Sequence, residues 1–98
     1  MYLKVHDTPN GKIVAVCDKE LIGKVLDDGT IFMDLDKNRS FYVGKIASKD
    51  EIKKELASFS SLNFVGKNAI NLLLSLALVE KSSIEKVSSV PFVQVYDL

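Results

Sequence analysis

The chain has 98 residues, of which 47% are hydrophobic and 27% charged, and its thirteen basic residues balance thirteen acidic ones. Such a composition is typical of one folded domain and excludes a disordered chain, a basic arm or an acidic tail. Because Arg39 is the only arginine, bidentate gripping of phosphate or guanine is almost excluded as well.

Three features predict a cytoplasmic protein that enters no membrane. The single cysteine can form no internal disulfide, as is usual in a reducing cytosol. Residues 1–12 lack the apolar run of a secretion signal. The most apolar stretch, residues 69–79, is shorter than the roughly 17–25 residues that cross a bilayer, so we expect a buried helix there.

Two β-hairpins are predicted in the N-terminal half. Their strands comprise residues 2–6 and 12–18, then 30–35 and 40–45. The first pair flanks Asn10-Gly11, a strong turn signal, and the second pair flanks the polar loop 36–39. Between the hairpins, residues 19–23 form one helical turn that ends at Gly23, and residues 27–29 form a further turn.

Two helices are predicted after the hairpins. The first begins at Ser48, since Ser48 and Glu51 match the capping box S-x-x-E. Its apolar residues have helical spacing, at Ile52, Leu56 and Phe59. Serines end the helix, at Ser58, Ser60 and Ser61. The second helix, residues 64–79, is capped by Asn63 and is apolar on most sides, so we expect it at the centre of the core.

The tail adds a short element at residues 84–87, a break at Pro91 and a final strand at residues 92–96. The order of elements is therefore hairpin, hairpin, helix, helix and strand. It predicts a single α+β domain over residues 1–98. We expect a mixed, mainly antiparallel sheet, built from the two N-terminal hairpins and the C-terminal strand and packed on the two helices.

Cys17, beside Asp18, is the candidate nucleophile, and two interpretations of it remain open. In the first, it is a small buried apolar residue, the usual state of a free cysteine. In the second, it is a partly exposed thiol whose pKa is lowered by Lys19 or by the amino end of a short helix. Pairing with a histidine base is disfavoured, because a register with His6 opposite Lys12 puts Cys17 on the other face, roughly 16 Å away.

Neither a metal nor a cofactor is predicted. One histidine and one cysteine cannot complete a zinc site, which takes three or four such ligands. The acidic pairs at residues 27–28 and 34–36 lack the glycine and the terminal glutamate of a calcium loop.

Four of the five glycines precede a lysine, at residues 11–12, 23–24, 44–45 and 66–67. Glycine lets backbone amides approach an anion, and the lysine adds charge, so converging turns would form a phosphate-binding rim. The alternative is that these glycines only end elements. None matches the P-loop spacing, so nucleotide hydrolysis has no support. An exposed Tyr42 or Tyr96 would stack on a base, for roughly 1–3 kcal/mol each, whereas core packing is the alternative.

Five stretches occur in the following order: KVH (4–6), AVCDKELIGK (15–24), FYVGK (41–45), LNFVGK (62–67) and VPFVQV (90–95). Together they resemble the small archaeal family DUF424 over nearly the whole chain, and the block C-D-x-E-L-x-G-K is the most specific part. Typical members read F-Y-G-G at 41–44, A-N-L-V-G near 62–66 and P-H-A-Q at 91–94. Val43 here replaces a glycine, and Phe92 replaces a histidine. Any chemistry of that histidine is therefore lost in this chain, which favours a structural or binding role for the position.

The family has no established activity, and the resemblance implies a housekeeping role near RNA or the ribosome through its association with translation genes. We therefore expect a non-enzymatic cytoplasmic domain that binds RNA or a ribonucleoprotein of the translation apparatus. The expected contact residues are Lys24, Lys45, Asn63, Gly66 and Lys67. Two further glycines, Gly23 and Gly44, are expected to shape the turns. Asp18 and Glu20 would bond the backbone or cap the short helix. Two alternatives stay open: a thiol enzyme or redox protein that uses Cys17 with Asp18, and a protein adaptor that uses strand 92–96 as a sheet edge.

Overall fold

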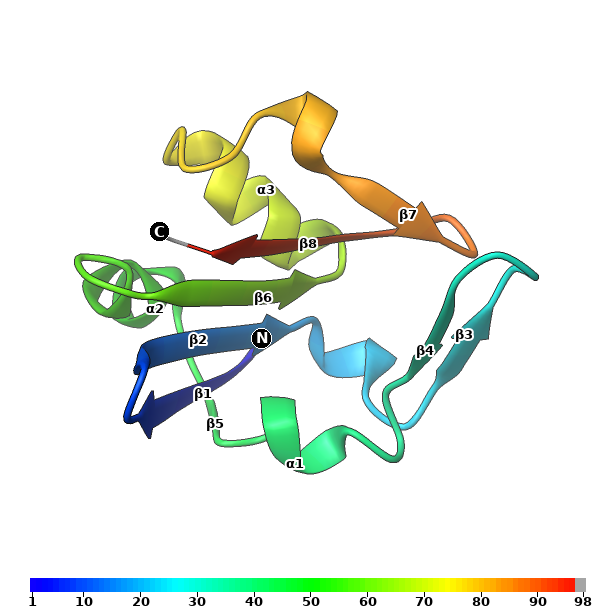
Figure 1. Cartoon of the computed structure of the whole chain (residues 1–98), viewed down its shortest axis with the longest axis horizontal. Coiled ribbons are helices and arrows are strands. Elements are labelled where there is room, and N and C mark those ends of the chain that lie inside the picture. The colour runs from blue at the N-terminus through cyan, green and yellow to red at the C-terminus, as the bar shows by residue number, and fades with distance from the viewer. Residues whose placement is uncertain (97–98) are drawn as a thin grey trace.

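A mixed sheet of six strands forms the body of the chain in the computed structural model, which describes residues 1–96 (Figure 1). Its strands are β1 (Tyr2–Thr8), β2 (Gly11–Cys17), β5 (Lys45–Ile46), β6 (Ser61–Val65), β7 (Glu85–Val87) and β8 (Val90–Tyr96). Their order across the sheet is β5-β1-β2-β6-β8-β7, with β2 and β6 parallel and the other pairs antiparallel. Because β2 and β6 are parallel neighbours, the segments that follow Cys17 and Val65 leave the sheet side by side, at the carboxyl ends of these two strands.

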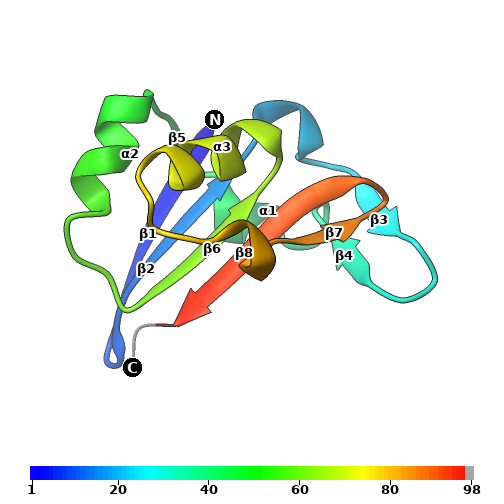
Figure 2. The ribbon, with the colours of Figure 1, turned by 90° about the horizontal axis from the view of Figure 1, so that it is seen from above.

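Helices and a smaller hairpin cover the faces of this sheet. The helices are α1 (Arg39–Tyr42), α2 (Lys49–Glu55) and α3 (Lys67–Ser75), and the 3-10 turns are η1 (Lys19–Leu21) and η2 (Lys81–Ser83). Strands β3 (Val25–Asp27) and β4 (Phe32–Asp34) pair with each other and project from one end of the molecule (Figure 1). Helices α2 and α3 lie together on one side of the sheet, as Figure 2 shows.

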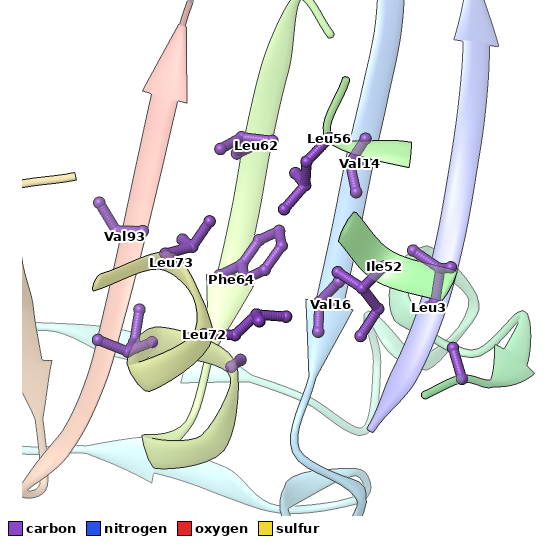
Figure 3. Close-up of a cluster of buried hydrophobic side chains, with 13 residues drawn as sticks. Leu3, Val14, Val16, Ile52, Leu56, Leu62, Phe64, Leu72, Leu73 and Val93 are labelled. Atoms are coloured by element: carbon purple, nitrogen blue, oxygen red, sulfur yellow. The ribbon is translucent and has the colours of Figure 1, made fainter. Parts of the chain in front are cut away.

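The face under α2 and α3 carries the larger core. Alternation along the strands brings six apolar side chains to this face: Leu3, Val14, Val16, Leu62, Phe64 and Val93. They meet Ile52 of α2, Leu56 directly after α2, and Leu72 and Leu73 of α3 (Figure 3). Each fully buried side chain of this kind contributes roughly 1.5–3 kcal/mol. This layer therefore holds both helices on the sheet.

A second, smaller core lies on the opposite face. It comprises Ala15, Cys17, Leu21, Leu26, Leu35, Tyr42, Val65, Val87 and Phe92. These residues come from the end of the sheet where β2 and β6 finish and from η1, α1 and the β3–β4 hairpin. The cover reaches only half of this face, since Gln94 and Tyr96 further along β8 are exposed. The uncovered half is called the open half below.

The α+β class with one mixed sheet confirms the sequence prediction. The capping box is also confirmed: the Glu51 N–H donates to Ser48 Oγ at 3.2 Å, and the Ser48 N–H donates to Glu51 Oε1 at 3.1 Å. The helical turn η1 is present, and Gly23 after it has a φ of 91°. The last strand does return to the sheet, where β8 lies between β6 and β7.

The predicted second hairpin, residues 30–35 with 40–45, is wrong. Strand β4 pairs with β3, which precedes it, around a turn in which the Asp28 carboxylate accepts the N–H groups of Thr30 and Ile31. Residues 39–42 form α1, which buries Tyr42 against the second core. The β-rich composition of this stretch was overridden by that tertiary contact, as is common for β-propensity.

The predicted register of the first hairpin is also wrong by one residue. The turn has two loop residues, so His6 pairs with Ile13 and not with Lys12. Cys17 consequently pairs with Tyr2 and shares a face with His6. Four residues of β2 still separate their positions, roughly 13 Å, so they do not form a catalytic pair.

The prediction that Asn63 caps a helix over residues 64–79 is wrong. Asn63 lies in the middle of β6, and α3 begins only after Gly66 and ends at Ser75. A short apolar run is compatible with a buried strand as well as with a helix, which explains the error. Pro91 does not break the last strand either, because it pairs with Lys86 inside β8. Within residues 1–96, no helix is both long and apolar enough to cross a membrane.

Candidate functional site

The open half of the sheet carries a row of polar and aromatic side chains. On β6 they are Ser61 and Asn63, and on β8 they are Gln94 and Tyr96. In the antiparallel register Asn63 pairs with Gln94, and Ser61 pairs with Tyr96. Directly opposed residues have Cβ atoms about 4.5–5.5 Å apart, so each pair forms one unit on the surface.

The Asn63–Gln94 pair forms part of the wall of a pocket of about 390 Å³, called the amide pocket below. Its other walls come from the β3–β4 hairpin and from α1. The remaining lining residues are Phe32, Met33, Asp34, Leu35, Asn38, Phe41 and Tyr42. This volume lies within the range of small-molecule sites in proteins.

Asn63 is the unusual member of this pocket. Asn63 is 9% exposed, which makes it the buried member of the polar residues that line the pocket. Within the described residues no fully buried side-chain nitrogen or oxygen lacks a hydrogen-bond partner, so the Asn63 amide is not an unsatisfied buried group. Since Asn63 lines the pocket beside Gln94, both amides are available to a ligand there.

Aromatic rings form the opposite wall of the amide pocket. Phe32 on β4 is 65% exposed, which is unusual for a phenylalanine. Phe41 is held in place by His6, whose ring stacks on it at 4.6 Å and whose Nε2 donates to the Phe41 carbonyl oxygen at 2.8 Å. Burial raises the pKa of Tyr42 to about 12, so its hydroxyl keeps its proton at neutral pH.

A second pocket adjoins Tyr96 at the other end of the open half. It measures about 460 Å³ and is lined by Thr8, Asn10, Gly11, Ile13, Ser60, Ser61 and Tyr96. Tyr96 is 66% exposed. Because side chains two residues apart point to the same face of a strand, Tyr96 and Gln94 connect the two pockets. The result is a track with an exposed ring at each end and two amides between.

The chemistry of this track is that of binding. Amides neither gain nor lose protons near neutral pH, but each offers both donors and an acceptor. Asp34 is the only residue with a carboxylate among those that line the two pockets. Its Oδ1 accepts the N–H groups of Asp36 and Lys37. Neither pocket is lined by a lysine or an arginine. No group of three or more metal-ligating side chains occurs within the described residues.

The sequence also singled out Asp18 and Gly66, which the structure brings together for a structural purpose. The Asp18 carboxylate accepts the N–H of Asn68 through Oδ2 and that of Ala69 through Oδ1, both at 2.9 Å. These are amides of the first turn of α3, which otherwise have no acceptor within the helix. Asp18 is only 1% exposed. It therefore caps α3 from a position about fifty residues earlier in the chain.

The four Gly-Lys turns do not converge. The turn at residues 11–12 lies at the opposite end of β2 from Asp18, and Lys12 forms an ion pair with Glu55 at 2.9 Å. Lys45 forms an ion pair with Glu51 at 2.6 Å. The glycine before it, Gly44, allows β5 to approach β1, because a Cβ there would collide with a backbone carbonyl.

Lys24 and Lys67 are both exposed and form no ion pair within residues 1–96. Lys67 is the first residue of α3, where β6 ends, and Lys24 follows η1 beyond the end of β2. The structure thus leaves two of the three predicted lysine contacts uncommitted, on the side where the parallel strands finish.

Cys17 belongs to the second core and has no exposed surface. Burial, followed by the nearby carboxylates of Asp18 and Glu20, raises the pKa of its thiol to about 12. A nucleophilic cysteine needs the opposite shift. The first interpretation of Cys17, as a small buried residue, is therefore confirmed, and the thiol-based alternative loses its support.

Sequence analysis missed Gln94 and Phe32 as members of the site. A signal for Gln94 existed, since strand alternation puts it on the same face as Tyr96. Its pairing with Asn63 could not be inferred while Asn63 was assigned to a helix. Phe32 is brought to the pocket by the β3–β4 pairing, which residue patterns did not indicate.

The comparisons with known proteins agree with this fold. Among solved structures, the chain is similar to an uncharacterized conserved protein from Methanopyrus kandleri, with a TM-score of 0.80 and 24% sequence identity. The match covers 97% of this chain and 89% of that one. At this identity the likeness shows the fold alone. Comparison with curated proteins finds no match.

The family comparison agrees with the resemblance found from the motifs of the sequence. The profile of the family described as "Protein of unknown function (DUF424)" matches residues 6–98. That range includes Asp18 with its partner Gly66, and both amides of the pocket. The chain belongs to the DUF424 family.

Proposed function

We propose that this domain binds single-stranded RNA on the open half of its sheet. One observation carries the proposal: the paired amides of Asn63 and Gln94 lie between two exposed rings, Phe32 and Tyr96. Proteins that read single-stranded RNA stack splayed bases on aromatic rings and hydrogen-bond the edges of those bases. The track offers both interactions side by side.

The amide pocket suits a base better than it suits a phosphate. It presents donors, acceptors and aromatic surface but no basic side chain. A base edge is a row of donors and acceptors, which Asn63 and Gln94 can match in either sense. Stacking on Phe32 or Tyr96 would add roughly 1–3 kcal/mol for each base.

The lysines proposed from the sequence have a secondary role in this hypothesis. Lys24 and Lys67 remain proposed contacts for phosphates, and Lys45 would first have to leave Glu51. With so few basic contacts, RNA affinity should depend only modestly on salt. The family's association with translation, implied by the resemblance, makes a ribosomal particle the proposed source of the RNA.

The direct test is a titration of fluorescently labelled RNA and DNA oligonucleotides, followed by anisotropy. The variants are Phe32→Ala, Gln94→Ala and Tyr96→Ala, which alter exposed side chains and should leave the fold intact. Ile46→Ala, at an exposed apolar position on the far edge strand, is the matched control. We expect each site variant to weaken RNA binding and the control to bind as the wild type does. Absence of binding at about 50 mM salt, or equal loss in the control, would refute the proposal.

A protein adaptor remains the second candidate, because part of the β8 edge is free. Strand β7 pairs only with residues 90–92, so within the described chain no strand pairs with the outer edge of residues 93–96. An extended peptide could add there as a further strand. Such a partner would bind with little salt dependence and would be insensitive to Phe32→Ala.

A further inference from the structure

A second surface, separate from the RNA track, lies beside α3 and is called the lysine groove below. It occupies about 400 Å³ between α3 and the segment formed by η2 and β7. Its lining residues are Lys67, Ile70, Asn71, Leu74, Lys81, Ile84, Lys86 and Pro91. Helix α3 packs on the face of the sheet that is opposite the amide pocket, so the two sites do not merge.

The floor of the lysine groove is aliphatic. Ile70 and Pro91 are buried there, while Leu74 and Ile84 are half-buried and remain partly open to the groove. Lys67, Asn71 and Leu74 recur at the i, i+4, i+7 spacing and therefore share one stripe of α3. This stripe is not covered by the sheet.

The rim of the lysine groove is basic, although Lys67 also lines an adjoining pocket with Asp18 and Glu20. Lys67, Lys81 and Lys86 are exposed, and none forms an ion pair within residues 1–96. No acidic residue lines the groove. Glu85 is next to Lys86 on β7, but alternation along the strand directs its side chain to the other face. In a chain with balanced charge, three free lysines around one groove form a local positive field.

We propose that the lysine groove docks an acidic segment of a partner protein, with an apolar side chain of that segment seated between Leu74 and Ile84. Charge complementarity selects the acidic partner, because carboxylates would reach the three lysines from above the floor. The aliphatic floor selects a peptide over a nucleic acid, since it offers no ring for a base and no arginine for a phosphate. A free anion would leave the apolar floor uncovered.

The lysine groove shares Lys67 with the proposed phosphate contacts but no residue with the amide pocket, so one spectrum can follow the two sites separately. The protein is labelled with ¹⁵N and titrated with a synthetic peptide of alternating Glu-Glu and Leu-Leu blocks. Two matched peptides replace all glutamates by glutamine or all leucines by serine. We expect amide shifts confined to α3, η2 and β7, with the amides of Phe32 and Asn63 unmoved. Shifts spread over the surface, or none up to millimolar peptide, would overturn the proposal.

Charge reversal provides the second measurement. The variant Lys67→Glu/Lys81→Glu/Lys86→Glu should bind the acidic peptide at least about tenfold more weakly. The variant Lys19→Glu/Lys37→Glu/Lys49→Glu makes the same change of net charge at exposed positions outside the groove and should bind nearly as the wild type does.

Both substituted peptides should also bind more weakly, because each lacks one of the two interactions. Equal weakening in the two charge variants would show attraction to net charge alone and would refute a built groove. Binding of the glutamine peptide at full strength would refute it as well. RNA affinity at the amide pocket is measured in parallel, so that loss of one activity is not mistaken for loss of the other.

Discussion

The carboxylate of Asp18 occupies the space that a side chain at Gly66 would fill. Gly66 has a φ of 110° and is the last residue before α3, and Asp18 bonds two amides of the first turn of that helix. Two of the stretches that resemble the family, residues 15–24 and 62–67, therefore meet at one helix cap. Asp18 and Gly66 have a structural role in this cap.

The Asp18–Gly66 pair predicts a non-additive effect on stability. Asp18→Ala should lower the free energy of unfolding by about 1–3 kcal/mol, because two amides lose their acceptor. Asp18→Asn should cost less, since one oxygen remains. Gly66→Ala should cost on the order of 1–3 kcal/mol from backbone strain. The collision of the new Cβ with the Asp18 carboxylate should add to this cost. Urea unfolding of the single and double variants measures these values.

In the double variant Asp18→Ala/Gly66→Ala, the space around position 66 is vacant, so we expect a smaller loss than the sum of the two single losses. Coupling of directly contacting residues is usually about 0.5–3 kcal/mol. Strict additivity would contradict the close contact between Asp18 and Gly66.

The Cys17 thiol should be inert in the native protein. It has no exposed surface, and its pKa is raised to about 12, mainly by burial. A thiol reagent at pH 8 should therefore react at the rate of unfolding, and immediately in denaturant. Rapid reaction of the folded protein would revive the thiol-based alternative.

The same raised pKa makes stability depend on alkaline pH. The unfolded thiol ionises near the ordinary value of 9.0, whereas the folded thiol does not until about 12. Unfolding consequently becomes easier as the pH rises through this interval, because only the unfolded state releases the proton. In Cys17→Ala this part of the pH dependence should be absent, although the buried Tyr42, with its pKa also near 12, keeps a similar contribution at higher pH.

Glu51 should stabilise the fold above pH 4.5 and lose that contribution in acid. The hydrogen bond from Lys45, then the N–H of Ser48, lower the pKa of Glu51 from 4.5 to about 2. As the pH falls from 4.5 towards 2, the unfolded state takes up a proton first, and stability declines. Glu51→Gln preserves the capping box but removes the charge. The difference in the free energy of unfolding between this variant and the wild type, measured with urea, should therefore shrink between pH 7 and pH 2–3. Because the carboxylate is exposed, added salt should shrink it at pH 7 as well.

RNA binding should separate into a stacking part and an electrostatic part. Phe32→Ala/Tyr96→Ala should reduce affinity at every salt concentration, because stacking does not involve charge. Lys24→Ala/Lys45→Ala/Lys67→Ala should instead flatten the plot of log affinity against log salt, whose slope is about −0.7 for each phosphate contact with a single strand. The measurement is anisotropy across about 50–300 mM salt, repeated as co-sedimentation with ribosomal particles. An unchanged slope in the triple variant would remove the lysines from the proposed contact surface.

Local sequence patterns were sufficient where the signal lay within a few residues. The Ser48–Glu51 box and the return of the last strand were inferred correctly, because each depends on neighbours or on alternation alone. The helix assignment of residues 64–79 failed at its start, since a short apolar run has no period that distinguishes a buried strand from a helix. Asn63 lines the amide pocket, but it was placed on the wrong element, and its role as a contact residue stays a prediction.

The sequence by itself determined the class of this protein: a small α+β domain with balanced charge, in the DUF424 family. Only the tertiary structure decided which residues meet. The parallel pairing of β2 with β6 brings Asp18 to the start of α3, and the pairing of β6 with β8 brings Asn63 beside Gln94. Both pairings join segments more than twenty-five residues apart, and such contacts are selected by burial of the whole core, for which no local spacing in the chain is a guide.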